Sequence, residues 1–152
     1  MDININTKII LMTMEEQYII EDVKKFITGG KAEFTVQNVV SNNHLTFSIS
    51  KDKVKPHFYV NVCYSYVQYI YIGLLVINDG KYSFIKSKRL QDSKEDSTSV
   101  KVIEYMIKYY LNSDDGHNNL AFYHHGRCCK CGRPLTTPES IQKGIGPFCD
   151  SL

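Results

Sequence analysis

The chain has 152 residues and a formal net charge of +2, with 43% hydrophobic and 22% charged residues. This length suits one domain with a core of its own, and the composition is ordinary for a soluble globular protein. The five cysteines are odd in number and four lie near the C-terminus, which excludes the evenly spread disulfide scaffold of a small secreted domain. The charge alone favours no class of partner.

The first residues are not basic, and the apolar run 9–12 is too short for the core of a signal peptide. The apolar zone 60–77 is interrupted by polar residues and alternates, so we do not expect it to span a membrane. Clustered cysteines suit a reducing compartment with metal-bound thiolates. We therefore expect a cytoplasmic protein.

The chain begins with a leader, 1–13, that we expect to be a short strand or disordered. Residues 15–28 are predicted to form a helix whose apolar face comprises Ile19, Val23, Phe26 and Ile27. The pair Gly29-Gly30 ends this helix.

Alternating apolar residues then predict five strands, around 34–36, 45–49, 57–64, 68–77 and 82–84. A second helix is expected from Ser97 or Ser99 to Leu111, with Val100, Ile103, Ile107 and Leu111 facing the core. A short strand, 120–123, leads to the cysteine-rich tail. The predicted fold is α+β: an antiparallel sheet of about five strands, two main helices on one side, and a C-terminal zinc finger. Residues 14–123 form the body, and 124–152 pack on it within a single domain.

The tail has the spacing of a metal site. Cys128 and Cys131 are separated by two residues and followed by Gly132, which lets a tight turn present both thiolates to one ion. A short helix, capped by Thr137, begun by Pro138 and ended by Gly144, returns the chain so that Cys149 can be a third ligand. A histidine, His124 or His125, is expected as the fourth ligand, and Cys129 is interpreted as a bystander.

The segment 124–149 also resembles a known signature, His-x-Gly-Arg-Cys-x-x-Cys-Gly-Arg-x-Leu-Thr-x-Pro-Glu-Ser-Ile-x-x-Gly-Ile-Gly-Pro-x-Cys. It identifies a family of uncharacterised DUF6011-like domains that is common in bacteriophage genomes. The matching positions include Arg127, Gly132, Arg133, Leu135, Thr136, Pro138, Glu139, Ser140, Ile141 and Gly144 to Pro147. More loosely, the strand 69–73 is similar to one in phage proteins that carry this tail. The resemblance favours His124 over His125 and implies a structural Cys3His zinc site closed to substrate.

Two surface features have alternative interpretations. Four cations surround the finger: Arg127, Lys130, Arg133 and Lys143. They could contact phosphates, but we favour the interpretation that they offset the negative charge of zinc-bound thiolates. Five tyrosines could stack on bases, although packing between strands is the more common role of such residues. They are Tyr59, Tyr64, Tyr66, Tyr69 and Tyr71.

No catalytic motif is recognisable, and Asp114, Asp115 and His117 are interpreted as a solvated loop. We therefore expect a small non-enzymatic zinc-containing binding protein of phage type. Its expected partner is a host protein or complex, as for a defence-system inhibitor such as an anti-CRISPR. One alternative is a nucleic-acid-binding protein that uses the tyrosines and the finger cations, and another is a nucleotide- or nucleic-acid-processing enzyme.

Overall fold

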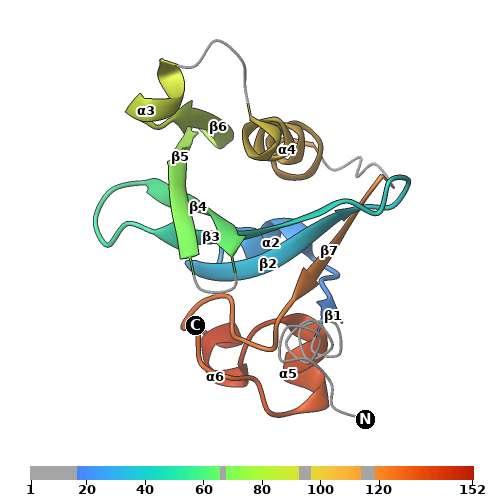
Figure 1. Ribbon diagram of the computed structural model, residues 1–152. Coiled ribbons are helices and arrows are strands. Elements are labelled where there is room, and N and C mark those ends of the chain that lie inside the picture. The colour runs from blue at the N-terminus through green and yellow to red at the C-terminus, as the bar shows by residue number, and fades with distance from the viewer. Residues whose placement is uncertain (1–16, 66–67, 93–96, 114–118) are drawn as a thin grey trace.

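The computed structural model describes residues 17–65, 68–92, 97–113 and 119–152. It shows one antiparallel sheet of seven strands in the order β1-β7-β2-β3-β4-β5-β6 (Figure 1). The strands are β1 (Tyr18–Ile19), β2 (Lys31–Asn38), β3 (His44–Lys51), β4 (His57–Ser65), β5 (Gln68–Asn78), β6 (Lys81–Lys86) and β7 (Leu120–His124). Five short α-helices accompany the sheet in the described residues: α2 (Val23–Ile27), α3 (Lys88–Gln91), α4 (Thr98–Met106), α5 (Pro138–Lys143) and α6 (Pro147–Asp150).

The predicted architecture of about five strands and two main helices is therefore wrong, and the protein is mostly β. The largest error falls on the expected helix 15–28. Tyr18 and Ile19 instead pair with β7, where Tyr18 lies opposite His124. The helix begins only after Asp22, whose carboxylate caps it by accepting the backbone N–H of Lys25 at 3.1 Å. Residues 15 and 16 lie outside the described part of the chain.

The five expected hairpin strands are all present as β2 to β6, because alternation and turn chemistry specify them locally. Asp79-Gly80 forms the two-residue connection between β5 and β6, with both residues in the left-handed region. The expected short strand 120–123 is present as β7, which inserts between β2 and the unexpected strand β1 at the other side of the sheet. This insertion joins residues about 90 positions apart and has no local signal in the sequence.

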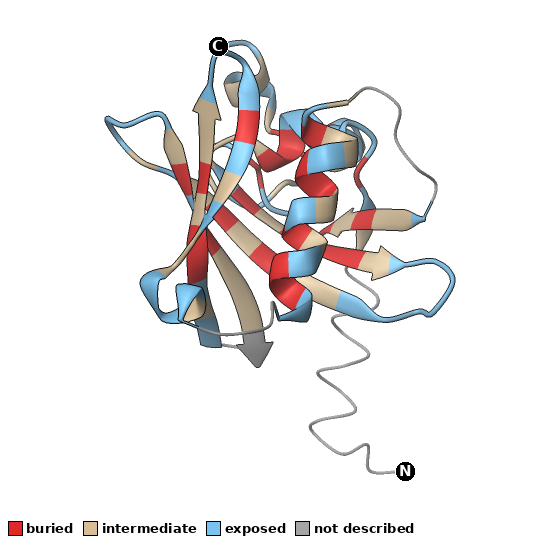
Figure 2. Cartoon of the chain, turned by 90° about the horizontal axis from the view of Figure 1, so that it is seen from above, coloured by how far each residue is buried: buried red, intermediate tan, exposed pale blue. Residues whose placement is uncertain are grey.

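The second expected helix is confirmed in position. Ser97 caps α4 through the backbone N–H of Val100, and α4 continues into a π-helical segment, η1 (Ile107–Leu111). The four residues of this helix that were predicted to face the core are buried, because α4 lies across one face of the sheet (Figure 1). Apolar strand residues on the same face meet it and form the core, which Figure 2 shows as red bands along the strands and the helix.

The other face of the sheet carries the polar side chains of the strands. Tyr59, Tyr69 and Tyr71 lie on it and are 38%, 40% and 42% exposed, while their neighbours Phe58 and Ile72 are buried in the core. At the β1 and β7 end, α5 contacts β1, and α5 and α6 lie together there (Figure 1). No helix among the described residues is long and apolar enough to cross a membrane.

The free edge of β6 is partly closed by side chains. Asn112, which follows η1, accepts the backbone N–H of Tyr82 and donates its amide to the Tyr82 carbonyl, both at 2.8 Å. Gln91 donates to the carbonyl of Lys86 at 2.7 Å. These side chains occupy backbone groups that would otherwise be open to pairing with another chain.

We predict that Asn112→Ala lowers the free energy of unfolding by about 1–3 kcal/mol, because it leaves two backbone groups of Tyr82 without their partner. The variant should also self-associate more than the parent protein, through the opened β6 edge. Urea unfolding and analytical ultracentrifugation measure the two effects. Lys101→Ala, on the exposed side of α4, is the control that should change neither.

Candidate metal centre

Cys128 and Cys131 lie in a tight turn directly after β7. The backbone N–H of Gly132 donates to the Cys128 carbonyl at 2.9 Å, and the N–H of Cys128 donates to the Arg133 carbonyl at 2.9 Å. Gly132 has a φ of 76°, a conformation that glycine adopts without strain. The turn therefore holds both cysteines on one short loop, as the spacing in the sequence predicts.

Cys149 reaches this loop through two short helices. Thr137 and Ser140 cap α5 reciprocally, Pro138 begins it, and Gly144 ends it with a φ of 72°. A β-carbon at Gly144 would lie 2.7 Å from the ring of Phe26, so only glycine lets α5 approach α2 this closely. Pro147 then begins α6, which carries Cys149. The helix and turn predicted between the cysteines are confirmed.

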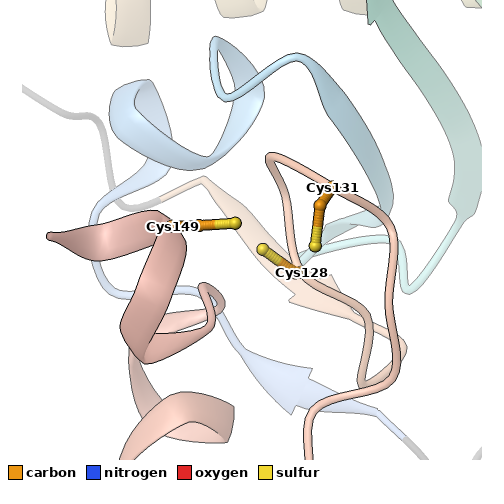
Figure 3. Close-up of side chains that lie close together, drawn as sticks. All are labelled: Cys128, Cys131 and Cys149. Atoms are coloured by element: carbon orange, nitrogen blue, oxygen red, sulfur yellow. The ribbon is translucent and has the colours of Figure 1, made fainter. Parts of the chain in front are cut away.

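The three sulfur atoms converge from these two segments (Figure 3). The Sγ atoms of Cys128, Cys131 and Cys149 all lie within 4.8 Å of one another. In tetrahedral zinc sites, Zn–S bonds of about 2.3 Å place sulfur atoms roughly 3.8 Å apart. The three sulfur atoms are therefore close enough together for their thiolates to bind one ion.

Backbone N–H groups point at the innermost sulfur. Cys128 Sγ accepts from the N–H of Lys130 at 3.5 Å and from that of Gly146 at 3.4 Å. Burial opposes ionisation of Cys128, but these donors and that of Cys131 outweigh it and lower the pKa of the thiol to about 7. Burial and the neighbouring sulfurs raise the pKa of Cys149 to about 11. Cys149 therefore needs a bound cation nearby to be a thiolate near neutral pH.

The structure does not bring His124 into this group. His124 is fully buried, and its ring stacks on Phe26 with the centroids 5.5 Å apart. Its Nδ1 accepts the N–H of Gly126 at 3.0 Å, so Nε2 carries the proton and donates to the Ile141 carbonyl at 2.6 Å. Both ring nitrogens are therefore used by the backbone, and burial lowers the pKa of the imidazole.

The two neighbouring candidates also lie elsewhere. His125 Nε2 is 3.0 Å from the hydroxyl of Thr35, which is itself 2.8 Å from the hydroxyl of Thr46. Cys129 is buried and packs so closely on Gly29 that a β-carbon there would be 2.6 Å from its sulfur. Cys129 is thus outside the sulfur group. Among the described residues, the candidate site consists of three cysteines.

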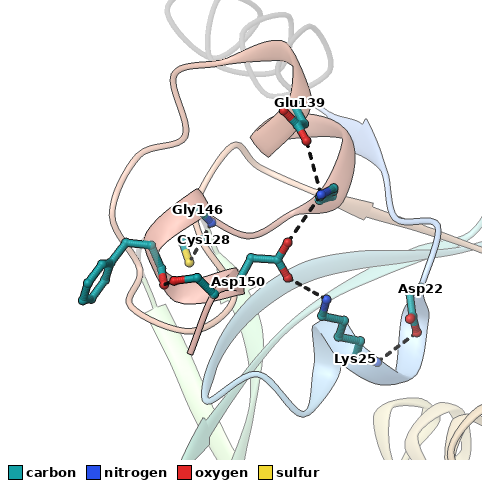
Figure 4. A network of polar contacts seen from close by, with 9 residues as sticks. Asp22, Lys25, Cys128, Glu139, Gly146 and Asp150 are labelled. Atoms are coloured by element: carbon teal, nitrogen blue, oxygen red, sulfur yellow. Dashed lines mark hydrogen bonds and ion pairs between the residues drawn. The ribbon is translucent and has the colours of Figure 1, made fainter.

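Salt bridges tie the two helices of the tail to α2 (Figure 4). Asp150 on α6 binds Lys25 at 2.8 Å and Lys143 at 3.4 Å, and Lys143 also binds Glu139 at 3.3 Å. Two of the predicted finger cations therefore make contacts within the fold. Lys143 forms ion pairs within α5 and with α6, and Arg127 donates to the Gly132 carbonyl at 3.1 Å. The bridge from Lys25 has no signal in the sequence, because its partner lies 125 residues away.

The remaining predicted site residues lie either outside the described part of the structure or on the exposed face of the sheet. The tyrosine face is the part of that surface formed by Tyr59, Tyr69 and Tyr71. Tyr59 donates to Asp52, and Tyr69 donates to Glu33 at 2.7 Å. The ring of Tyr71 lies 6.4 Å from that of Tyr59. Of the other predicted site residues, the side chain of Tyr64 and all of Tyr66, Asp114, Asp115 and His117 lie outside the described part of the structure.

Residues 119–152 match the model of a family of unknown function, DUF6011. This match confirms the resemblance for the C-terminal segment, which covers the candidate metal site and β7. No curated protein and no solved structure matches the chain.

We predict that His124→Asn lowers stability but leaves metal binding intact. Asparagine can still accept the Gly126 N–H, but it loses the bond to Ile141 and the stacking on Phe26, at a cost of about 1–3 kcal/mol. Metal content per folded chain and thermal melting measure the two effects. His125→Asn, which removes a hydrogen bond outside the core, is the matched control. Loss of metal from folded His124→Asn, with metal retained in His125→Asn, would show that His124 is a ligand.

Proposed function

We propose that Cys128, Cys131 and Cys149 bind a structural zinc ion that fixes the C-terminal segment to the sheet. The convergence of three sulfur atoms around backbone N–H donors is the observation that supports this role. An all-sulfur set selects soft or borderline metals, and zinc is the one most often held this way by a short two-cysteine turn. Bound zinc would neutralise charge that otherwise keeps these thiols from ionising together.

Zinc removal tests this proposal. Protein purified without chelator should contain one zinc per chain, and chelation should lower the melting temperature by about 10 °C or more, because metal binding contributes directly to folding. Cys131→Ser should lose zinc and melt at the temperature of the chelated protein. Cys63→Ser, in β4, is the control that should keep zinc. The absence of stoichiometric metal from the parent protein would refute the proposed site.

We further propose that the chain is a non-enzymatic binding protein of phage type that acts on a host protein or complex, for example as a defence-system inhibitor. The C-terminal resemblance to domains common in bacteriophage genomes motivates the host partner. The tyrosine face, formed by Tyr59, Tyr69 and Tyr71, offers a binding surface, because partly exposed tyrosines are enriched where proteins meet.

The charges on this face favour a protein over a nucleic acid. The hydroxyls of Tyr59 and Tyr69 donate to the carboxylates of Asp52 and Glu33, respectively. The N–H of Lys55, the Tyr59 hydroxyl and the N–H of Val54 hold the pKa of Asp52 well below its usual range, so this group is charged at neutral pH. Such carboxylates would repel the phosphates of a base-stacking ligand.

A double variant tests the proposed surface. Tyr59→Ala with Tyr71→Ala should abolish capture of a specific host protein by the tagged chain and weaken binding of the purified partner at least tenfold. Lys101→Ala on α4 should bind as the parent does. Equal capture by all three proteins would contradict the surface. Binding to single- or double-stranded nucleic acid at low salt, lost in the double variant, would favour the nucleic-acid alternative instead.

A further inference from the structure

The three-cysteine group is asymmetric in its exposure. Cys128 is 1% exposed and lies at the inner end of the group. Cys131 and Cys149 are only partly buried. The group is therefore covered at Cys128, which also accepts two backbone N–H groups, and is partly exposed at Cys131 and Cys149; Figure 3 shows the three side chains pointing toward one another.

Two potential metal ligands of the tail, His124 and Cys129, are committed to the fold. Both ring nitrogens of His124 are hydrogen-bonded to the backbone, at Gly126 and Ile141. Cys129 is directed into the core against Gly29, and its backbone joins two segments, accepting from Lys31 at 2.7 Å and donating to Gly144 at 3.0 Å. Moving either residue to the sulfur group would break buried contacts, which costs several kcal/mol.

We propose that the three cysteines form an incomplete ligand set among the described residues, and that a thiolate from another molecule completes it where Cys131 and Cys149 are partly exposed. This inference rests on the proposed metal centre and names the chemistry of its fourth ligand. A borderline metal held by three sulfur atoms readily accepts a fourth, giving the tetrahedral all-sulfur set.

The local charge also favours an anionic ligand over a neutral one. The segment 127–133 carries three cations, Arg127, Lys130 and Arg133, and no carboxylate. Three thiolates around a divalent ion have a net charge of −1, so these cations leave the loop positive and able to accommodate one more negative charge. Thiolate is preferred to carboxylate at such a site because sulfur is the softer donor.

Two sources could supply this thiolate: a small thiol such as glutathione, or a cysteine of a second protein molecule. Binding of a neutral thiol releases its proton to the solvent. Both sources should raise the affinity of the chain for the metal, because a ligand that binds only the metal-loaded state shifts the equilibrium toward it.

The full-length chain loaded with Co²⁺ provides the test, since cobalt reports its sulfur ligands by charge-transfer absorption. Glutathione should raise this absorbance by about one third, the change expected from three sulfur ligands to four, and should tighten metal binding. S-methylglutathione, which lacks the thiol, is the matched control and should have no effect. His124→Asn should show the same response to glutathione as the parent.

The possible results distinguish a failure of the proposed fourth ligand from a failure of the metal centre. A rise in absorbance with protein concentration alone, in the absence of glutathione, would assign the thiolate to a second copy of the chain. A tetrahedral cobalt spectrum unchanged by glutathione and by protein concentration would overturn the inference but leave the metal centre standing. A change of spectrum in His124→Asn before any thiol is added would also overturn it. Failure to bind cobalt or zinc would refute the metal centre.

Discussion

The backbone of Cys129 is the constraint on which the C-terminal segment depends. Its carbonyl accepts from Lys31 at the start of β2, and its N–H donates to the carbonyl of Gly144 at the end of α5. These two bonds fix the loop between the sheet and the helices. Within this turn, Cys129 is directed into the core against Gly29 while the sulfur of Cys128 lies in the sulfur group. The metal site and the hydrophobic core are thus positioned by the same peptide units.

The tail shares the core of the sheet. His124, buried between Tyr18 and Phe26, joins β1, β7 and α2, and its bond to the Ile141 carbonyl adds α5. Ile145 is buried in the same core cluster. The sulfur group therefore lies at the rim of a continuous core. A metal ion there would hold the helices of the tail against α2, in addition to the salt bridges of Asp150.

The features that were predicted correctly are those specified by neighbouring residues in the sequence. Strict alternation specified β2 to β6, and the caps at Ser97, Thr137 and Gly144 specified two helices, because each signal lies within a few residues of its effect. The pairing of β1 with β7 was missed, because the apolar spacing from Ile19 to Ile27 also fits a helix and only a distant strand decides between them. The cysteines of the site were identified by spacing. Spacing gives no information on ring hydrogen bonds, so the engagement of both His124 nitrogens could not be foreseen.

Hydrogen exchange with and without metal tests the central claim most directly, which is that the sulfur group binds a metal that holds the tail to the sheet. Chelation should abolish protection in 124–152 and weaken it in β1 and α2, which contact the tail, while β3 to β6 and α4 stay protected. This pattern would place the stabilisation by the metal at the junction described here. Equal protection of the tail in the two states would contradict the account, because the cysteines would then need no metal to stay in place.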